Sequence, residues 1–240
     1  ITGGYNETQH DNAVKIDVLR LNPFTIKSTA NFSELLSKVP GVDMISKGSG
    51  VSKPVIRGLS MNDILVLNNG VRFENYQYSS HHPLGIDEFG IEEVEIIKGP
   101  ASLLYGSDAI GGVINIIKER PASINTIAGD YNLQLFSNTL GMTNNLGIKG
   151  ASKKFFGGII IGQKTNADYL QGGGAFVPNS RFNELSFKAN TGFTDKIGTF
   201  KLFYDFNNEK LGMVEDEAIK EIAERGRKTE IWYEEFKTHL

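Results

Sequence analysis

The chain of 240 residues contains no cysteine, which excludes disulfide bonds and thiolate metal sites. It has no apolar run near the roughly 20 residues that a transmembrane helix needs, so a helical membrane protein is excluded, whereas membrane strands, which alternate in polarity, are not. The formal net charge of −3 and the lack of a basic stripe give no sign of a nucleic-acid partner. The chain starts at Ile1 without a basic-then-apolar leader, so we expect any export signal to have been removed or to lie outside this sequence.

No arrangement of residues that is typical of an enzyme is found. The motifs HExxH and GxSxG, the phosphate-binding P-loop and a GxGxxG motif in a suitable context are absent. Glu93 and Glu95 share one face of a predicted strand, and an ion-paired or solvated face explains them more simply than acid–base catalysis. We therefore expect no enzymatic activity and no cofactor.

The most informative stretch of the sequence runs from Val94 to Ile117. Two short apolar strands, Val94–Ile97 and Val113–Ile117, are predicted on either side of a centre rich in glycine and small residues. Pro100 suits the first position of a helical turn, because proline loses no hydrogen bond there. Spacing alone also fits an ordinary strand–turn–strand in a small α/β domain.

A short helix and a hairpin are predicted upstream of this stretch. The helix runs from about Phe32 to Val39, with Asn31 as its N-cap, an apolar residue at the i, i+3, i+4 and i+7 positions, and Pro40 after its end. The hairpin strands are residues 64–67 and 71–73, because the Asn69-Gly70 pair between them suits a type I′ turn.

From about Ile124 the pattern changes to a period of two, which is typical of strands with one apolar face. Residues 185–193 and 200–206 alternate most clearly, and five strands are visible, with residues 228–240 as a possible sixth. The pattern fits a soluble antiparallel sandwich as well as membrane strands of about 9–11 residues. Short turns alternate with long connections, such as residues 168–180, which favours a membrane barrel.

The order of motifs resembles the plug domain of TonB-dependent outer-membrane receptors. The residues that carry the resemblance are Glu95–Pro100, Leu104-Tyr105-Gly106 and Ala109–Asn115, which match the family's (R/K)GP, YG and AIGG-strand elements, with Lys98 where many members carry arginine. Upstream, Phe32–Val42, Ile56-Arg57-Gly58 and Ile64–Val71 resemble the family's helix with its PGV stop, its IRG element and its hairpin. Ile1-Thr2-Gly3 resembles the end of the segment that joins the TonB box to the plug, so a complete TonB box would lie at or before residue 1.

This resemblance implies an α/β plug domain with a small mixed sheet at residues 1–120, followed at residues 124–240 by antiparallel transmembrane β-barrel strands. Plugged barrels have about 22 strands, so we expect an incomplete barrel and a chain that covers the plug and the first quarter of the wall.

The resemblance also implies where a solute would bind. In the family, the loop before the (R/K)GP strand and the loop after the PGV stop face outward and touch the substrate. The candidate substrate-binding residues are Ser49, Tyr76, Tyr78, Ser79, Ser80, His81 and His82. His81 and His82 are also candidate metal ligands, because imidazole suits Zn, Cu, Fe and Ni, with Asp87 and Glu88 as the nearest carboxylates; exposed loop residues are the simpler interpretation. Arg57 and Lys98 occupy positions where the family places cations that contact barrel carboxylates.

We therefore expect a TonB-dependent active-transport receptor that imports a scarce solute, with a metal or a metal chelate such as a ferric siderophore favoured by the Tyr/His loop. The implied location is the outer membrane of a Gram-negative bacterium, with the plug inside the barrel lumen. The implied partners are outer-membrane lipid, the small-molecule or metal-chelate ligand and a TonB-type energy-coupling protein. The alternative is a non-transport binding or signalling module built on a plug-like domain.

Overall fold

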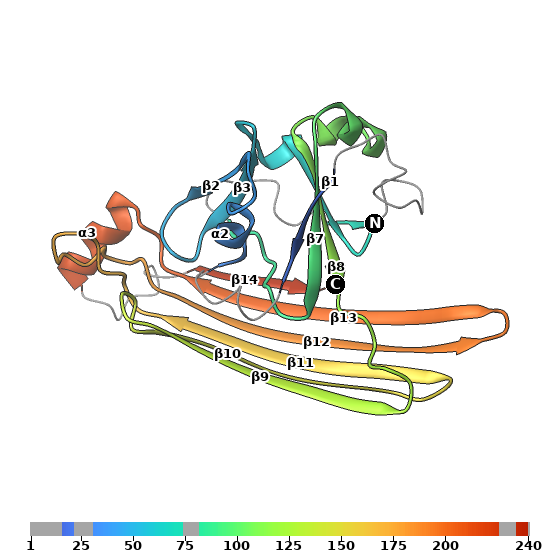
Figure 1. Ribbon diagram of the computed structural model, residues 1–240. Coiled ribbons are helices and arrows are strands. Elements are labelled where there is room, and N and C mark those ends of the chain that lie inside the picture. Colours follow the sequence, from blue (N-terminus) through green and yellow to red (C-terminus); the bar gives the residue numbers. More distant parts are fainter. Residues whose placement is uncertain (1–15, 22–30, 74–81, 226–233, 240) are drawn as a thin grey trace. The chain divides into compact units, whose positions relative to one another are not determined.

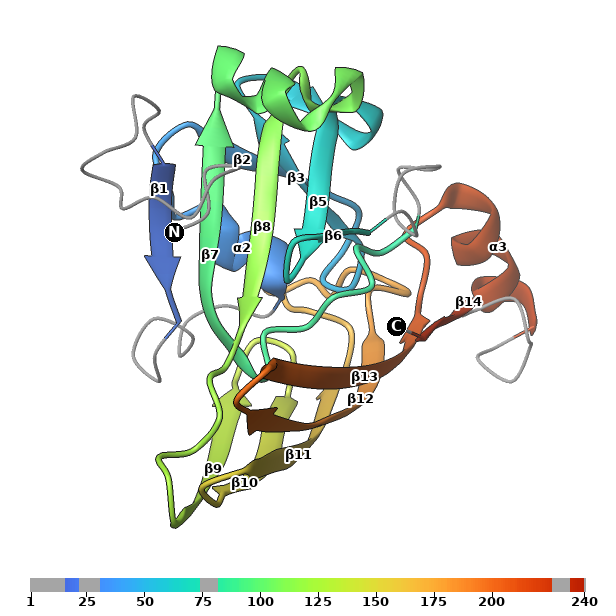
Figure 2. The same ribbon diagram turned by 90° about the vertical axis from the view of Figure 1, so that its right-hand side faces the viewer.

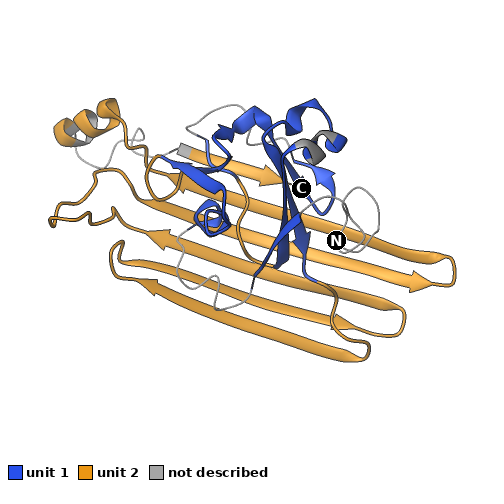
Figure 3. Ribbon diagram, turned by 45° about the horizontal axis from the view of Figure 1, so that its top comes forward, with its two compact units in different colours: residues 1–46, 52–84, 91–119 blue, residues 47–51, 85–90, 120–240 orange. Residues whose placement is uncertain are grey.

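The computed structural model describes residues 16–21, 31–73, 82–225 and 234–239, and the chain divides into two compact units (Figure 3). Unit 1 comprises residues 1–46, 52–84 and 91–119. Unit 2 comprises residues 120–240 together with two short segments from the first half of the sequence, 47–51 and 85–90. The predicted domains, residues 1–120 and 124–240, differ from these units because segments 47–51 and 85–90 belong to unit 2. The predicted domain boundaries stay a prediction.

Unit 1 contains a five-stranded mixed sheet in the order β1-β7-β8-β5-β6 (Figure 2). Strand β8 pairs antiparallel with β7 and parallel with β5, and β1 pairs antiparallel with β7. A smaller antiparallel sheet has the order β2-β3-β4. The strands are β1 (Ile16–Arg20), β2 (Val42–Ser46), β3 (Ser52–Ile56), β4 (Leu59–Ser60), β5 (Ile64–Asn68), β6 (Val71–Arg72), β7 (Ile91–Lys98) and β8 (Gly112–Lys118).

Local sequence signals explain the turns and the helix of unit 1. Helix α2 (Phe32–Leu36) begins at the predicted cap, where the Asn31 side chain accepts a hydrogen bond of 2.9 Å from the Glu34 N–H. It ends earlier than predicted, at Leu36, with a cap at Ser37. Asn69 and Gly70 both have positive φ, as a type I′ turn requires, and they join β5 to β6.

The glycine-rich stretch forms two 3₁₀ turns, η2 (Pro100–Tyr105) and η3 (Ser107–Ala109), and a third, η1 (Met61–Asp63), precedes β5. Gly112 has φ +155, and a Cβ there would lie 2.8 Å from the Ile97 carbonyl oxygen, so the strand can start beside β7 only with glycine. Ile16, Leu65, Ile97 and Val113 form one buried core cluster in this sheet.

Unit 2 is built on a six-stranded antiparallel sheet in the order β14-β13-β12-β11-β10-β9 (Figure 1). Five of its strands are 11 to 14 residues long. The strands are β9 (Thr126–Phe136), β10 (Gly141–Ala151), β11 (Phe155–Asn166), β12 (Phe182–Asp195), β13 (Gly198–Leu211) and β14 (Glu234–His239). The predicted period-two strands are confirmed, including the sixth.

The two faces of this sheet differ in chemistry. Register places Ile159 beside Ala189, which in turn lies beside Tyr204, and Ile161 beside Phe187, which lies beside Phe206. Ile159, Ile161 and Tyr204 are exposed, so this face is apolar and open. We call it the outward face. The opposite, inward face carries polar and charged side chains along β11–β13, many of them buried; they are Lys164, Asn166, Glu184, Ser186, Lys188, Asn207 and Glu209.

Connections within unit 2 have unequal lengths. Residues 152–154 and 196–197 make short turns, whereas residues 167–181 and 212–233 are long, and the second of these contains helix α3 (Asp216–Arg225). In the described residues, no helix has the length and apolar character needed to cross a membrane.

Candidate functional site

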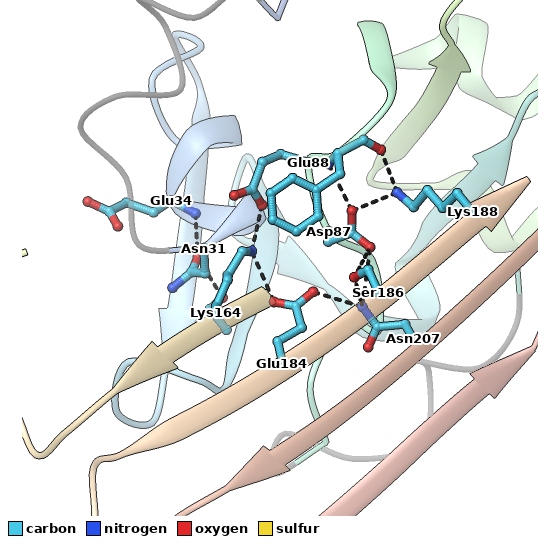
Figure 4. Close-up of polar contacts among 11 residues, drawn as sticks. Asn31, Glu34, Asp87, Glu88, Lys164, Glu184, Ser186, Lys188 and Asn207 are labelled. Carbon is cyan, nitrogen blue, oxygen red and sulfur yellow. Dashed lines mark hydrogen bonds and ion pairs between the residues drawn. The ribbon is translucent and has the colours of Figure 1, made fainter. Parts of the chain in front are cut away.

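A buried polar site forms where residues 85–90 meet the inward face of β11, β12 and β13 (Figure 4). We call residues 85–90 the anchor segment. We call the side chains that it meets the wall cluster, which consists of Lys164 on β11, Glu184, Ser186 and Lys188 on β12, and Asn207 on β13. Alternation along each strand directs these residues to the same face, because strand side chains repeat every second position.

Asp87 makes most of the contacts of the anchor segment. Its Oδ1 accepts a hydrogen bond from Lys188 Nζ at 2.6 Å and another from the Phe89 N–H at 2.8 Å. Its Oδ2 accepts from Ser186 Oγ at 2.7 Å and from Asn207 Nδ2 at 3.3 Å. Only 1% of Asp87 is exposed, so four protein donors take the place of water around the carboxylate.

Glu88 and Lys164 form the second ion pair. Lys164 Nζ lies 2.6 Å from Glu88 Oε2 and 3.0 Å from Glu184 Oε2, and both Lys164 and Glu88 are buried. Asn207 Nδ2 donates to Glu184 Oε1 at 2.7 Å, which connects this pair to the contacts of Asp87. The two ion pairs therefore belong to one hydrogen-bonded network.

Phe89 fills the space between the ion pairs and the strand. Its ring lies 5.3 Å from Lys164 Nζ, in cation–π range, and its carbonyl oxygen accepts from Lys188 Nζ at 2.6 Å. Gly162 lies beneath the ring, and a Cβ on Gly162 would overlap it. The wall therefore needs glycine at this position for the ring to pack.

Electrostatics keep Asp87 charged. Burial by itself would raise the pKa of Asp87, but the ammonium groups of Lys188 and Lys164 outweigh burial, and the pKa lies below its ordinary value. Glu209 adds another buried carboxyl, and it lies directly across from Glu184 in the β12–β13 register.

The other short segment of unit 2, residues 47–51, contacts the same strands through apolar packing. Val51 is buried in a cluster with Phe182, Leu211 and Met213. A Cβ on Gly50 would lie 2.5 Å from Leu211 and 2.8 Å from Phe182, so the backbone approaches the wall closely. Ser49, a predicted substrate contact, is half-buried within this segment.

Of the remaining predicted substrate contacts, only His82 lies among the described residues. Tyr76, Tyr78, Ser79, Ser80 and His81 lie outside the described residues. His82 is half-buried and belongs to unit 1, and Ser49 belongs to unit 2, so a substrate site that includes both stays a prediction.

The predicted metal site likewise stays a prediction, because one of its two ligands is not described. Within the described part of the chain, no group of three or more His, Asp or Glu residues is arranged to hold a metal ion. Asp87 and Glu88, the carboxylates nearest to the histidines in sequence, are engaged with Lys188 and Lys164 instead.

Lys98 and Arg57, the predicted barrel contacts, lie in unit 1. Lys98 Nζ is 2.6 Å from Asp17 Oδ2 and also donates to the Pro40 carbonyl oxygen at 2.5 Å, so it has partners within its own unit. Arg57 is exposed, with φ +52, and its guanidinium lies beside Gly99. A role of either cation in contacting barrel carboxylates stays a prediction.

The wall cluster was not among the predicted sites. Lys164 and Lys188 look in sequence like solvated positions of alternating strands, and their partners lie 76 and 101 residues away. Two features of the sequence could have indicated the cluster. One is the set of polar residues on the same face of the strands, and the other is the acidic pair Asp87-Glu88 after the predicted loop; the polar positions are 164, 184, 186, 188 and 207.

Part of the chain matches the model of a known family. Residues 8–113 match the model of the TonB-dependent Receptor Plug Domain. A vitamin B12 transporter BtuB of Photobacterium profundum is 43% identical over 88 residues, which are 36% of this chain and 14% of the relative. The BtuB of Vibrio vulnificus is 47% identical over 89 residues, which are 35% of this chain and 14% of the relative.

Solved structures share the fold over most of the chain. The copper transporter OprC aligns with a TM-score of 0.70 at 20% identity, over 82% of this chain and 31% of OprC. The pyoverdine receptor FpvA of Pseudomonas aeruginosa PAO1 aligns with a TM-score of 0.71 at 16% identity, over 86% of this chain and 29% of FpvA. The chain thus spans about a third of these structures. Residues 8–113 match the plug domain family of TonB-dependent receptors, and the strands after them share the fold of these solved structures.

Proposed function

We propose that the chain belongs to an outer-membrane active-transport receptor that draws energy from a TonB-type protein and imports a scarce solute. The observation that carries the proposal is the combination of a plug domain with a wall whose outward face is apolar and whose inward face is polar. Soluble domains rarely leave a continuous apolar face of this size uncovered, whereas lipid-facing strands alternate in this way.

The dimensions of the apolar face support a membrane location. On β12 the outward positions from Leu185 to Phe193 span roughly 26 Å along the strand at about 3.3 Å per residue, which is roughly 20 Å of height at the tilt of about 35–45° that barrel strands have. The apolar band of outer-membrane barrels is about 25 Å tall. Beyond Leu185 the outward positions become polar, because Asn183 pairs in register with Thr165 on β11 and with Lys210 on β13.

An aromatic row marks the other limit of this band. Phe193 lies between Phe155 and Phe200, with ring centroids 6.5 Å and 5.7 Å apart, next to the short turns of the sheet. Outer-membrane barrels carry aromatic girdles where the lipid meets water. The short turns would then lie on the periplasmic side, and the long connections 167–181 and 212–233 would face outward.

For the solute we propose a metal or a metal chelate. The support is the loop with Tyr76, Tyr78, His81 and His82, whose side chains suit metal or chelate contact. Structural neighbours named as a copper transporter and a pyoverdine receptor carry the same fold, and the BtuB relatives, named as vitamin B12 transporters, match over about a third of the chain. A non-transport binding or signalling module is the alternative, since a plug-like domain does not by itself require import.

An uptake assay in three strains tests the proposal. Accumulation of labelled ferric siderophores, copper and cobalamin is measured in the parent, in a strain that lacks this receptor and in a strain that lacks the energy-coupling protein. We expect at least one solute whose accumulation is lost in both deletion strains. Accumulation that needs the receptor but not the energy-coupling protein would contradict the mechanism, and outer-membrane binding without accumulation would favour the alternative.

A further inference from the structure

Each lysine of the wall cluster has an acidic neighbour on the wall itself, besides its partner on the anchor segment. Lys164 pairs in register with Glu184 across β11 and β12, and their charged atoms already lie 3.0 Å apart. Lys188 pairs in register with Asp205 across β12 and β13, and Asp205 shares the inward face with Asn207. Directly opposed side chains of an antiparallel pair are close enough to interact.

This arrangement gives the two lysines a choice of carboxylates. With the anchor segment docked, Lys188 bonds to Asp87 and Lys164 is shared between Glu88 and Glu184. If the segment left a wall without such neighbours, both ammonium groups would lose their carboxylate partners, and the lost attraction would oppose release. Here Lys164 keeps Glu184, and Asp205 can replace Asp87.

We propose that the anchor segment and the wall cluster form a releasable ionic latch: when residues 85–90 leave the wall, Lys188 exchanges Asp87 for Asp205, and Lys164 gives up Glu88 and keeps Glu184. The rest of the docking contact suits reversible release. Phe89 lies on Gly162 and Gly90 lies against Ile160, so the segment contacts β11 through one ring and its own backbone.

The position of the anchor segment in the sequence determines what its release would affect. Residues 85–90 connect the stretches 52–84 and 91–119, which both belong to unit 1. Release of the latch would therefore free the chain on either side, including His82 and the start of β7, from one fixed point on the wall. This role in transport rests on the proposed function, whereas the exchange of ion-pair partners does not.

The latch predicts effects of opposite sign for carboxylates on its two sides. Asp87→Asn and Glu88→Gln weaken docking, because they remove the partners that the lysines have in the docked state. Glu184→Gln and Asp205→Asn strengthen docking, because they remove the partners that the lysines would have after release. A fixed structural network predicts instead that all four substitutions loosen the segment.

Hydrogen exchange of the peptide that spans residues 85–90 measures docking in the complete, solute-free receptor in outer-membrane vesicles. We expect Asp87→Asn to accelerate exchange by roughly tenfold or more, and Asp205→Asn and Glu184→Gln to slow it. Asp195→Asn, which removes the same charge from the exposed turn end of β12, is the matched control and leaves exchange unchanged.

Acceleration by Asp205→Asn and Glu184→Gln would overturn the latch and assign the cluster to a fixed network. Unchanged exchange in Asp87→Asn would show that the ion pair does not hold the segment. If the Asp87→Asn receptor does not reach the outer membrane, Glu88→Gln takes its place, because Lys164 then keeps Glu184. The exchange measurement needs no solute. A result that overturns the latch therefore does not bear on the proposed function, which the uptake assay tests separately.

Discussion

Replacing Gly162 by alanine provides a steric test of how the anchor segment docks. A Cβ on Gly162 would overlap two carbons of the Phe89 ring, whereas carbon atoms in contact prefer separations of about 3.5–4.0 Å. The ring must therefore move away from β11, which disturbs its contact with Lys164 and the Phe89 carbonyl bond to Lys188. Overpacking of this kind costs about 1–3 kcal/mol.

The expected result is a docking free energy lowered by about 1–3 kcal/mol in Gly162→Ala, read from hydrogen exchange of residues 85–90. Gly150→Ala is the matched control, because a Cβ there meets Ile127 at an ordinary 3.5 Å. Phe89→Ala also weakens docking. In the Phe89→Ala background, however, Gly162→Ala should cost almost nothing, because the atoms that it meets are gone. Additive effects of the two substitutions would refute the proposed packing of Phe89 on Gly162.

Three further predictions concern the charges of the wall cluster. Lys164→Met leaves Glu88 and Glu184 buried without their ammonium group, so we expect the free energy of unfolding to fall by about 3–5 kcal/mol. Thermal or denaturant unfolding measures this loss, and the control Lys201→Met, at an exposed position, should cause no more than a small change. Glu209→Gln replaces a buried carboxyl directly opposite Glu184 by an amide of nearly the same shape, so it should be neutral or stabilise the protein by up to about 1 kcal/mol, and a clear loss would contradict the assigned register. The lowered pKa of Asp87 means that its contribution to docking is complete above the ordinary value of about 3.9 and is lost as pH falls through the lower, folded-state pKa. The difference in exchange between the wild type and Asp87→Asn should therefore be constant from pH 7 to about 4 and shrink only at lower pH, and a decline already at pH 6 would argue against a charged, paired Asp87.

Much of the fold follows from local sequence, because local physics decides those elements. Asn31 caps helix α2, and the Asn69-Gly70 turn has the positive φ values that its residues favour. Pro100 opens a 3₁₀ turn, and strict alternation gives the long strands β12 and β13.

The buried polar contacts could not be predicted in the same way. Glu95 was expected on an ion-paired or solvated face, but it is buried and accepts a hydrogen bond of 3.0 Å from Asn115 Nδ2. Alternation identifies which strand positions share a face, but a polar face looks the same whether water or another segment covers it. The pairing of Asp87 with Lys188 depends on register and on the path of the chain over 101 residues, which no local pattern encodes.

The central claim is that unit 2 forms a membrane wall with one lipid-facing and one inward-facing side, and its most direct test uses three neighbouring positions of β12. Because the sequence has no cysteine, single cysteine substitutions at Ala189, Asn190 and Thr191 allow specific nitroxide labelling. Accessibility to oxygen, which concentrates in lipid, is then compared with accessibility to a water-soluble relaxation agent in the bilayer-embedded receptor. The account predicts high oxygen accessibility at residues 189 and 191 and low oxygen accessibility at residue 190. Equal values at the three positions, or the reverse alternation, would contradict it.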